Sequence, residues 1–575
     1  MSLDDVKSLI ERIALENAVS FNGVAKPDAV LGKLLGTNPG LRNRVKEIIP
    51  IVQEITERIN RLSLNEQTVL LEKLGGIKKV EKIVKQELPP LPKADGFAKI
   101  VLRFAPNPDG PLTLGNARPA VLCDYYAKKM DGKFILRFED TSPSVKPPLR
   151  DAYEWVIEDL KWLGIEPNEI YYQSDRLPVY YKHAERFLEK GFAYVCLCKP
   201  ENFRVFEREG KPCPHREQDP SVSLSLWDKM LNGGLEPGEA VVRVKTDMQH
   251  PNPAVRDWPA LRIDLAEHPR VKGFRVWPLY NWSCAIDDYE MRVSHVIRGK
   301  EHMTNEVRQS YVFQYLNAPQ PVSIHIGRVG LEKSVLSKSK IMKGWAQGLY
   351  KSLDDPRLGT LRSLRRRGFR PEVIRRVILD MGLNITEAMV KWENLYAYNR
   401  EAVDWDSERY YFVKDPFRLV VEKMPGRIEA KLSRHPSRSE FGFRMVIVES
   451  PQGKAELFVS AEDVISLKPG SMIRLISLFN VEVEHVDFET RSVTASFKGT
   501  EIPEKSAGVR LIQWVLPDDA VKTRVLMPDA SYTEGLGESP LTKLSVGKMI
   551  QLVRFGFCMV EKASVGMVEL IFSHP

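Results

Sequence analysis

The feature that most constrains this chain is a strand, a tight loop, a helix and a second strand that follow one another between residues 98 and 140. The run AKIVLRFA is apolar with β-branched members, as in a buried strand. After a Pro- and Gly-rich loop, NARPAVLCDYYAKKM repeats apolar residues at helical spacing, and KFILRFED reads as the next strand. Strands and helices go on alternating beyond this unit, which predicts an α/β domain with a parallel sheet covered by helices.

Composition and pattern divide the rest of the chain. With 575 residues, the chain is too long to fold around a single hydrophobic core, so several domains of ~150 residues are expected. We expect a helical domain and linker over residues 1–98, an alternating α/β domain over 99–349, a basic helical stem over 350–403 and a β-barrel region over 404–575.

Charge and hydropathy place the chain only coarsely. No apolar segment reaches the ~20 residues of a membrane span, and the N-terminus reads as an amphipathic helix, not a signal peptide. We therefore expect a cytoplasmic protein with no membrane association. The net charge of +8 suits an acidic partner such as nucleic acid.

The loop between the first strand and the helix indicates a phosphate site. A helix N-terminus offers free backbone N–H groups and the positive end of a dipole. The loop matches neither the dinucleotide fingerprint nor the P-loop, so other groups must supply charge. Lys338 and Lys340 in EKSVLSKSKIMKG are the candidates, the alternative being a solvated surface turn.

Several ordered phrases carry a family resemblance. PLTLGNAR and LSKS resemble the HIGH and KMSKS signatures of class I aminoacyl-tRNA synthetases. RFAPNPDGPL, LRFEDTSP, HVIRGKEHMTN and DDPRLGTLRSLRRRG are similar to the glutamyl branch of the archaeal, glutaminyl-like type. The resemblance runs from about residue 99 to 399, and the β-rich tail fits that branch's anticodon-binding barrels.

The resemblance implies a fold and an activity. The fold would be α/β, with a class I Rossmann-type catalytic domain, an inserted acceptor-binding subdomain over about 178–285, an N-terminal helical domain and a C-terminal β-barrel anticodon-binding region. The enzyme would join glutamate to ATP, bound with magnesium, as glutamyl-adenylate. It would then pass the acyl group to the 3′ end of the tRNA for glutamate.

The nucleotide-binding residues carry over by position. Thr113 and Asn116 would hydrogen-bond phosphate, Gly115 would let the backbone approach the nucleotide, and Lys338 and Lys340 would stabilise the transition state. Both histidines of the first signature are replaced, and Val335 stands at the first lysine of the second. The expected nucleotide contacts are Pro106, Gly110, Pro111, Leu112, Thr113, Leu114, Gly115, Asn116, Ser337, Lys338 and Ser339.

The glutamate pocket carries over in the same way. Arg103 would pair with the substrate carboxylate, Glu139 would accept from its ammonium, and Tyr280 and Arg298 would line the side-chain pocket. Arg298 would select glutamate over glutamine, because a guanidinium facing an amide has no counter-charge. As alternatives, Arg103 pairs with Glu139, Tyr280 is a core aromatic, and Arg298 pairs with a neighbouring acid (Asp287, Asp288 or Glu301).

A second group of residues predicts a metal site. Cys196, Cys198, Cys213 and His215 offer three thiolates and one imidazole, a full tetrahedral set for a structural zinc ion. The alternative is a group of small buried cysteines beside a surface histidine. Glutamyl family members carry a zinc-binding stretch in the acceptor-gripping domain, which agrees with the place of this segment.

The expected partners follow from these regions. The basic stretch RSLRRRGFRPEVIRR would touch the tRNA backbone, and the barrels its anticodon, while the N-terminal helical domain is an expected contact for a protein partner. The functions kept as rivals are a catalytically weakened tRNA-binding paralogue, glutaminyl-tRNA synthetase, and an enzyme that glutamylates a tRNA base.

Overall fold

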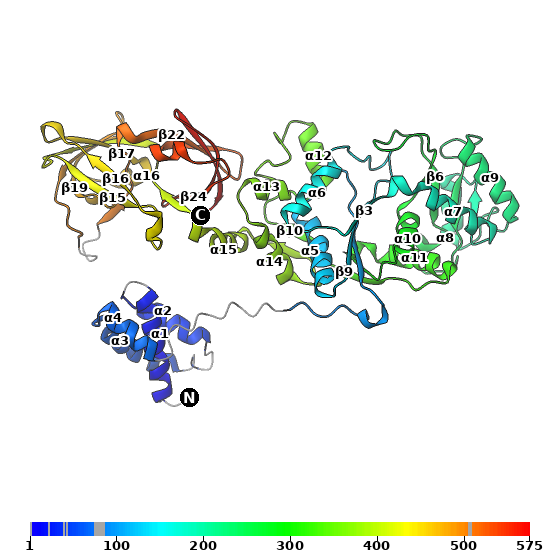
Figure 1. Ribbon diagram of the computed structural model, residues 1–575, viewed down its shortest axis with the longest axis horizontal. Helices are drawn as coiled ribbons and strands as arrows, with labels where there is room; N and C mark the ends of the chain where they lie inside the picture. The colour runs from blue at the N-terminus through cyan, green and yellow to red at the C-terminus, as the bar shows by residue number, and fades with distance from the viewer. Residues whose placement is uncertain (1–2, 21–22, 38–40, 42–43, 74–86, 504–508) are drawn as a thin grey trace. The chain divides into compact units, whose positions relative to one another are not determined.

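The computed structural model describes residues 3–20, 23–37, 41, 44–73, 87–503 and 509–575. The chain forms two compact units, residues 1–89 and 90–575 (Figure 1). The sequence places the first boundary after the Pro-rich linker, at residues 98 and 99. Within the part of the chain that the structure describes, no helix is both long and apolar enough to cross a membrane.

The N-terminal unit is helical. Its helices are α1 (Leu3–Ser20), α2 (Pro27–Thr37), α3 (Val45–Asn60) and α4 (Leu64–Lys73). One core joins α1 to the other three helices through buried side chains such as Val6, Leu34, Ile55 and Leu71. These helices agree with the helical domain predicted within residues 1–98, of which residues 74–86 are among those outside the described residues.

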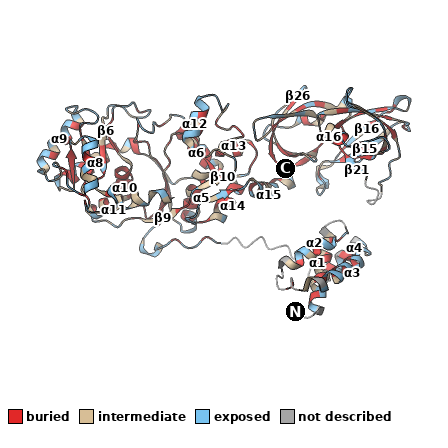
Figure 2. Cartoon of the chain, turned by 180° about the vertical axis from the view of Figure 1, so that it is seen from behind, coloured by how far each residue is buried: buried red, intermediate tan, exposed pale blue. Residues whose placement is uncertain are grey.

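A five-stranded parallel sheet forms the centre of the second unit, as the alternating sequence predicts. The strand order is β3-β2-β1-β8-β9. Its strands are β1 (Val101–Phe104), β2 (Lys133–Phe138), β3 (Glu169–Tyr172), β8 (His295–Gly299) and β9 (Val322–Ile326). All four residues of β1 are buried, as expected for a central strand covered on both faces. Figure 2 colours the described residues by burial, with buried residues in red.

Helices cover this sheet and connect its strands. They are α5 (Leu114–Lys129), α6 (Ala152–Trp162), α10 (Tyr280–Glu290) and α11 (Met303–Leu316). The helix α5 follows β1 and begins at Leu114, with Thr113 as its N-cap residue. The segment between β3 and β8 is long enough to hold a separate subdomain.

That subdomain contains an antiparallel sheet of order β4-β5-β6-β7, whose aromatic-rich core also includes residues of α10 and α11. Its strands are β4 (Ala193–Cys196), β5 (Val241–Val244), β6 (Pro259–Ile263) and β7 (Val276–Pro278). Its helices are α7 (Leu177–Glu189), α8 (Pro200–Glu209) and α9 (Pro220–Asn232). The subdomain is therefore inserted between β3 and β8 of the parallel sheet.

A helical stem follows the parallel sheet. It contains α12 (Lys338–Ala346), α13 (Leu361–Arg366), α14 (Pro371–Met381) and α15 (Trp392–Val403), with the parallel strand pair β10 (Val329–Leu331) and β11 (Ala388–Val390). Arg367, directly after α13, donates to the carbonyls of Phe572 and Ser573, so the stem is joined to the last strand of the chain.

The C-terminal region consists of two curled sheets and a hairpin. The strand orders are β12-β24-β25-β26-β22-β23-β13, β17-β14-β20-β19-β18-β21 and β15-β16. The bounds are β12 (Glu408–Tyr410), β13 (Phe412–Lys414), β14 (Pro416–Glu422), β15 (Ile428–Ser433), β16 (Phe443–Val448), β17 (Ala455–Ser460), α16 (Ala461–Val464), β18 (Met472–Leu475), β19 (Asn480–Asp487), β20 (Ser492–Phe497), β21 (Arg510–Ile512), β22 (Ala520–Leu526), β23 (Tyr532–Glu538), β24 (Met549–Leu552), β25 (Gly556–Ser564) and β26 (Met567–His574).

Both sheets curl toward closure, which confirms the prediction of barrels. In the seven-stranded sheet the edge strands β12 and β13 are separated by Tyr411 alone, so the two edges must meet. In the six-stranded sheet, the edge strand β17 pairs through Phe458 with Val515, which follows the other edge strand. Closure removes the exposed edges on which other chains could pair.

Candidate active site

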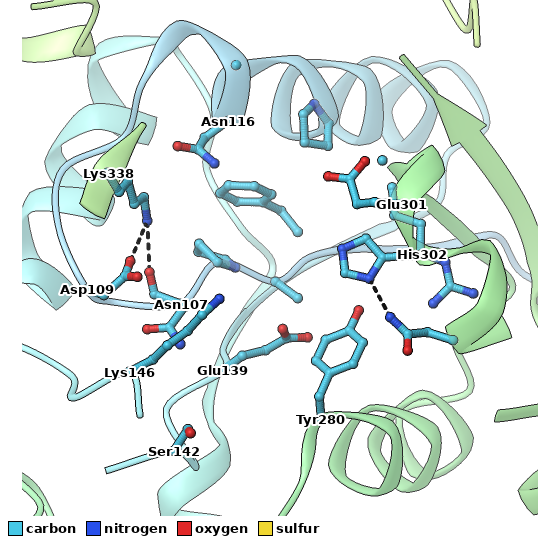
Figure 3. A pocket seen from close by; sticks show the side chains of 18 of the residues that line it. Asn107, Asp109, Asn116, Glu139, Ser142, Lys146, Tyr280, Glu301, His302 and Lys338 are labelled. Carbon is cyan, nitrogen blue, oxygen red and sulfur yellow. Dashed lines mark hydrogen bonds and ion pairs between the residues drawn. The ribbon is translucent and has the colours of Figure 1, made fainter. Parts of the chain in front are cut away.

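A cleft of about 950 Å³ opens where the parallel strands end. Residues from the ends of β1, β2 and β8, from the start of α5 and from the start of α12 line it (Figure 3). Seven basic residues and three acids are among the lining residues. They are Arg103, Arg118, Lys146, Arg298, Arg308, Arg328 and Lys338, against Asp109, Glu139 and Glu301. The excess of positive charge suits an anionic ligand.

The start of α5 is stabilised by two of the predicted nucleotide contacts. Asn116 Oδ1 accepts hydrogen bonds from the Thr113 amide at 3.2 Å and from the Thr113 hydroxyl at 3.0 Å. The hydroxyl hydrogen of Thr113 is thus already donated, whereas the side-chain nitrogen Nδ2 of Asn116 has no hydrogen-bond partner within the described ranges. Of the two side chains, Asn116 is therefore the better placed to donate to a ligand.

Not every predicted nucleotide contact reaches the cleft. Pro106, Thr113, Gly115, Asn116, Ser337, Lys338 and Ser339 line it, whereas Gly110, Pro111, Leu112, Leu114 and Lys340 do not. Leu112 and Leu114 are fully buried, and Lys340 is exposed on α12. Five of the residues predicted for the nucleotide site therefore lie outside the lining of the cleft. Their assigned contacts stay predictions.

Lys338 is held in place by the loop that follows β1. As the first residue of α12, it donates from Nζ to the carbonyl of Asn107 at 2.9 Å and to Asp109 Oδ1 at 3.2 Å (Figure 3). Burial lowers the pKa of Lys338, and the carboxylate of Asp109 opposes that shift. The lysine therefore joins the two segments that carry the signature-like phrases.

Arg103 belongs to a buried network of charges. Its Nε lies 3.3 Å from Asp288 Oδ1, to which Arg137 Nη1 also donates at 2.6 Å. Burial opposes the charged form of Arg103, but Asp288 raises its pKa above the usual value. The alternative pairing of Arg103 with Glu139 is wrong, because Glu139 Oε1 lies 3.5 Å from Arg137 Nη2 and accepts from Cys284.

Arg298 has only neutral partners. Nη1 donates to Gln309 Oε1 at 2.9 Å, and Nη2 donates to Ser323 Oγ at 3.0 Å. Nε is buried without a hydrogen-bond partner, as is Nη2 of Arg103. Among the described residues no carboxylate lies within 4.0 Å of Arg298, so the alternative in which it pairs with a neighbouring acid is wrong. Both guanidinium groups line the cleft and retain an unused donor.

Sequence reasoning missed His302, which lies beside Tyr280 (Figure 3). The ring centroids are 5.3 Å apart, and His302 Nδ1 lies 3.1 Å from Asn305 Nδ2. Burial, then Arg298, lowers the pKa of His302 to about 4, so the ring is neutral at pH 7. An amide nitrogen only donates, so Nε2 carries the ring proton and is a donor. The sequence signal that could have identified His302 is its position three residues after the end of the strand β8.

The predicted metal ligands come together in the inserted subdomain. The ligand atoms of Cys196, Cys198, Cys213 and His215 all lie within 4.8 Å of one another. Sγ of Cys196 and Cys213 are 3.9 Å apart, and Cys198 Sγ is 3.4 Å from His215 Nδ1. A tetrahedron with Zn–S bonds of about 2.3 Å has S–S edges of about 3.8 Å. The residues therefore fit a zinc ion.

Two family models match the second unit. "tRNA synthetases class I (E and Q), catalytic domain" matches residues 99–405, and "tRNA synthetases class I (E and Q), anti-codon binding domain" matches residues 407–499. Together they cover most of the chain.

Curated relatives match over almost the whole length. A glutamate–tRNA ligase of Pyrococcus furiosus is 48% identical over 99% of this chain and 100% of its own length. One from Pyrococcus abyssi is 48% identical over 98% and 100%, and one from Methanopyrus kandleri is 41% identical over 100% of both. The similarity therefore includes the N-terminal helices and the C-terminal barrels as well as the catalytic domain.

Proposed function

The chain belongs to the class I tRNA synthetases of the glutamate and glutamine branch, and from that premise we propose how its cleft ligates glutamate to tRNA. The enzyme is a glutamate–tRNA ligase. A glutamate carboxylate oxygen attacks the α-phosphorus of ATP, and pyrophosphate leaves. A ribose hydroxyl at the 3′ end of the tRNA then attacks the acyl carbon, and AMP leaves.

The observation that carries the assignment is the pair of guanidinium groups with unused donors in one cleft. Nη2 of Arg103 and Nε of Arg298 are buried and unpartnered, while Glu139 lines the same space. A buried donor without an acceptor costs about 1–3 kcal/mol, more when it is charged, so a ligand that supplies acceptors is favoured. Glutamate offers two carboxylates to the arginines and an ammonium group to Glu139.

We call this part of the cleft the glutamate end, formed by Arg103, Glu139, Tyr280 and Arg298. Arg298 is the residue that selects glutamate over glutamine. Its other partners, Gln309 and Ser323, are neutral, so its charge is compensated only by a bound carboxylate. The side-chain amide of a bound glutamine would leave the charge of Arg298 uncompensated. Its NH2 group would also face the guanidinium, so that two hydrogen-bond donors would oppose each other.

The nucleotide end is formed by Thr113, Gly115, Asn116 and Lys338. The N-terminus of α5 and the amide of Asn116 donate to phosphate, and Lys338 supplies the positive charge. To do so, Lys338 exchanges Asp109 for a phosphate oxygen. This exchange compensates for the histidines that the signature lacks here, since a neutral amide contributes no charge.

Cys196, Cys198, Cys213 and His215 would hold a structural zinc ion. With all four positions filled by protein side chains, the ion has no open coordination site and would serve to fix the fold of the insert. The four residues tie the end of β4 to the segment after α8. The insert would then present a rigid surface to the acceptor end of the tRNA.

The function is tested with the purified full chain, ATP, magnesium and total tRNA, supplied in parallel with labelled glutamate and labelled glutamine. We expect label on tRNA from glutamate alone. Label from glutamine would identify a glutaminyl-tRNA synthetase. No label with either amino acid would favour a tRNA-binding paralogue.

A further inference from the structure

The turn that precedes α5 is held on one side by the stem. The carbonyl of Leu112 accepts from the Leu361 amide at 2.9 Å, and the Leu114 amide donates to the Gly359 carbonyl at 3.0 Å. These bonds form an antiparallel bridge between Thr113 and Thr360. The amide of Gly359 in turn donates to the carbonyl of Val335, so one short segment holds both signature-like phrases.

On its other side the same turn is held by a buried carboxylate. Asp159 on α6 is 1% exposed and accepts from the Leu112 amide through Oδ2 at 3.2 Å. Asp159 does not line the cleft, so it does not bind a ligand directly. The backbone of Leu112 is therefore fixed between α6 and the stem.

The second oxygen of this carboxylate lacks a hydrogen bond. Oδ1 of Asp159 and Nε of Arg362 are both buried without partners, and they face each other at 3.9 Å. Arg362 is the second residue of α13, and its Nη2 pairs with Glu158. A shift of about 1 Å between α6 and α13 would bring Oδ1 and Nε to the ~2.9 Å of a charge-assisted hydrogen bond.

Such a carboxylate is a poor choice for stability alone. Burial raises the pKa of Asp159 to about 7, opposed by the charges of Arg362 and Arg365 and by the Leu112 amide. A neutral side chain of the same shape would satisfy the Leu112 amide without burying a charge. At pH 8, above that pKa, the carboxylate is ionised, and its burial lowers the stability of the fold.

We propose that Asp159 is a positioning residue for the ATP-dependent step, which holds the turn before α5 so that Asn116 and the helix N-terminus meet the phosphates. The inference rests on the proposed function of the nucleotide end. The carboxylate acts through two contacts. Its Oδ2 atom accepts from the Leu112 amide and fixes that residue. Its charge attracts Arg362 toward α6, together with the segment that holds both signature-like phrases.

The test compares Asp159→Asn with Glu158→Gln in glutamate-dependent ATP–pyrophosphate exchange, with tRNA present. Asparagine keeps an acceptor for Leu112 but loses the charge, and its NH2 group faces Arg362 Nε donor to donor. We expect at least a tenfold lower kcat with the KM for glutamate within twofold. Glu158→Gln, which loses an exposed partner of the same arginine, should stay within twofold of the wild type.

Thermal unfolding separates positioning from a folding role. Asp159→Asn should unfold at pH 8 at the wild-type temperature or above it, because a buried charge has been removed. A low kcat with retained stability supports the inference. A low kcat accompanied by lowered stability, or a wild-type kcat, overturns it.

Two further arms complete the experiment. Asp159→Asn combined with Arg362→Met should lower kcat by less than the product of the single effects, whereas multiplicative effects would overturn a coupled role. If the unmodified enzyme supports no exchange, the proposed function itself fails, whatever the variants do.

Discussion

The two ends of the cleft are built on different principles. At the glutamate end, Arg103 and Arg137 share Asp288 inside a buried network, and the partners of the arginines come from the strands, α10 and α11. At the nucleotide end the donors are mostly backbone groups and one side-chain amide, and Lys338 is tied to a loop carboxylate. The first end is preorganised around fixed charges, and the second has a charge that changes partners.

This difference determines what each end can contribute. A fixed buried guanidinium discriminates between substrates, because a ligand without a carboxylate leaves it uncompensated. A lysine that leaves Asp109 for a phosphate gains its interaction as charge develops, and interactions made only in the transition state raise kcat. Specificity is therefore expected from the glutamate end and rate from the nucleotide end.

The largest expected effect is at the glutamate end. Arg298→Ala should weaken glutamate activation by ~3–5 kcal/mol, more than a hundredfold, because the substrate carboxylate loses its buried counter-charge. The preference for glutamate over glutamine should shrink in parallel. Exchange kinetics with both amino acids measure this, with the exposed Arg292→Ala as control. A folded Arg298→Ala enzyme that still prefers glutamate to the same extent would refute the assignment of specificity to the glutamate end.

The nucleotide end should respond in kcat. Lys338→Ala should lower kcat by an amount that corresponds to ~2–4 kcal/mol of activation free energy, as for the loss of an oxyanion-type donor. The change in the KM for ATP should be smaller. Steady-state exchange kinetics at varied ATP concentrations provide the measurement.

Lys340→Ala is the matched control, because this lysine lies two residues away but does not line the cleft. The sequence assigns both lysines the same role, so equal losses in the two variants would restore that prediction. A change confined to the KM for ATP would count against the exchange of partners at Lys338.

The metal site should affect neither end directly. One zinc per chain is expected by elemental analysis, and Cys213→Ser should release it and reduce tRNA charging at least tenfold, about 1.4 kcal/mol. Cys558→Ser, a buried cysteine of the barrel region, is the control. Metal-free protein that folds and charges tRNA normally would refute the site.

The smallest effect tests Gly115. A β-carbon there would lie 3.6 Å from the nearest protein atom, an ordinary contact, so the protein itself does not require glycine. Gly115→Ala should raise the free energy of unfolding by about 0.5–1 kcal/mol through helix propensity, yet raise the KM for ATP. Denaturant unfolding and exchange kinetics measure the two effects.

Gly132→Ala is the comparison for that variant. Its β-carbon would lie 2.6 Å from the carbonyl oxygen of Ile100, so it should destabilise the fold without a direct effect on ATP binding. If Gly115→Ala left the KM for ATP unchanged, the close approach of nucleotide to backbone would be wrong.

Much of the fold could be predicted because it rests on local pattern. The apolar run AKIVLRFA, the helical spacing of NARPAVLCDYYAKKM and the run KFILRFED correspond to β1, α5 and β2. The sequence predicted a β-barrel region but not which strands pair. The pairing of Phe458 with Val515 could not be predicted, because it joins segments far apart in the sequence.

The site was less predictable, because its partners come from distant elements. The sequence allowed Arg103 to pair with Glu139, but the register sets Arg103 opposite Ile135 and leaves Glu139 beyond the end of β2. Asp287 and Asp288 were open partners for Arg298, but Arg176 and Arg137 occupy them. Which acid meets which arginine depends on how α10 packs on the sheet.

The sequence by itself determined the order of strands and helices, the family resemblance and the residue types that ATP, glutamate and zinc would require. These follow from periodicity, turn residues and short spacings, which act within a few neighbours along the chain. Only the tertiary structure decided that Lys338 is tied to Asp109, that Arg298 is left without an acid and that Asp159 holds Leu112. The physical reason is that a buried charge is defined by its partners and its loss of water, and both arise only when distant segments pack together.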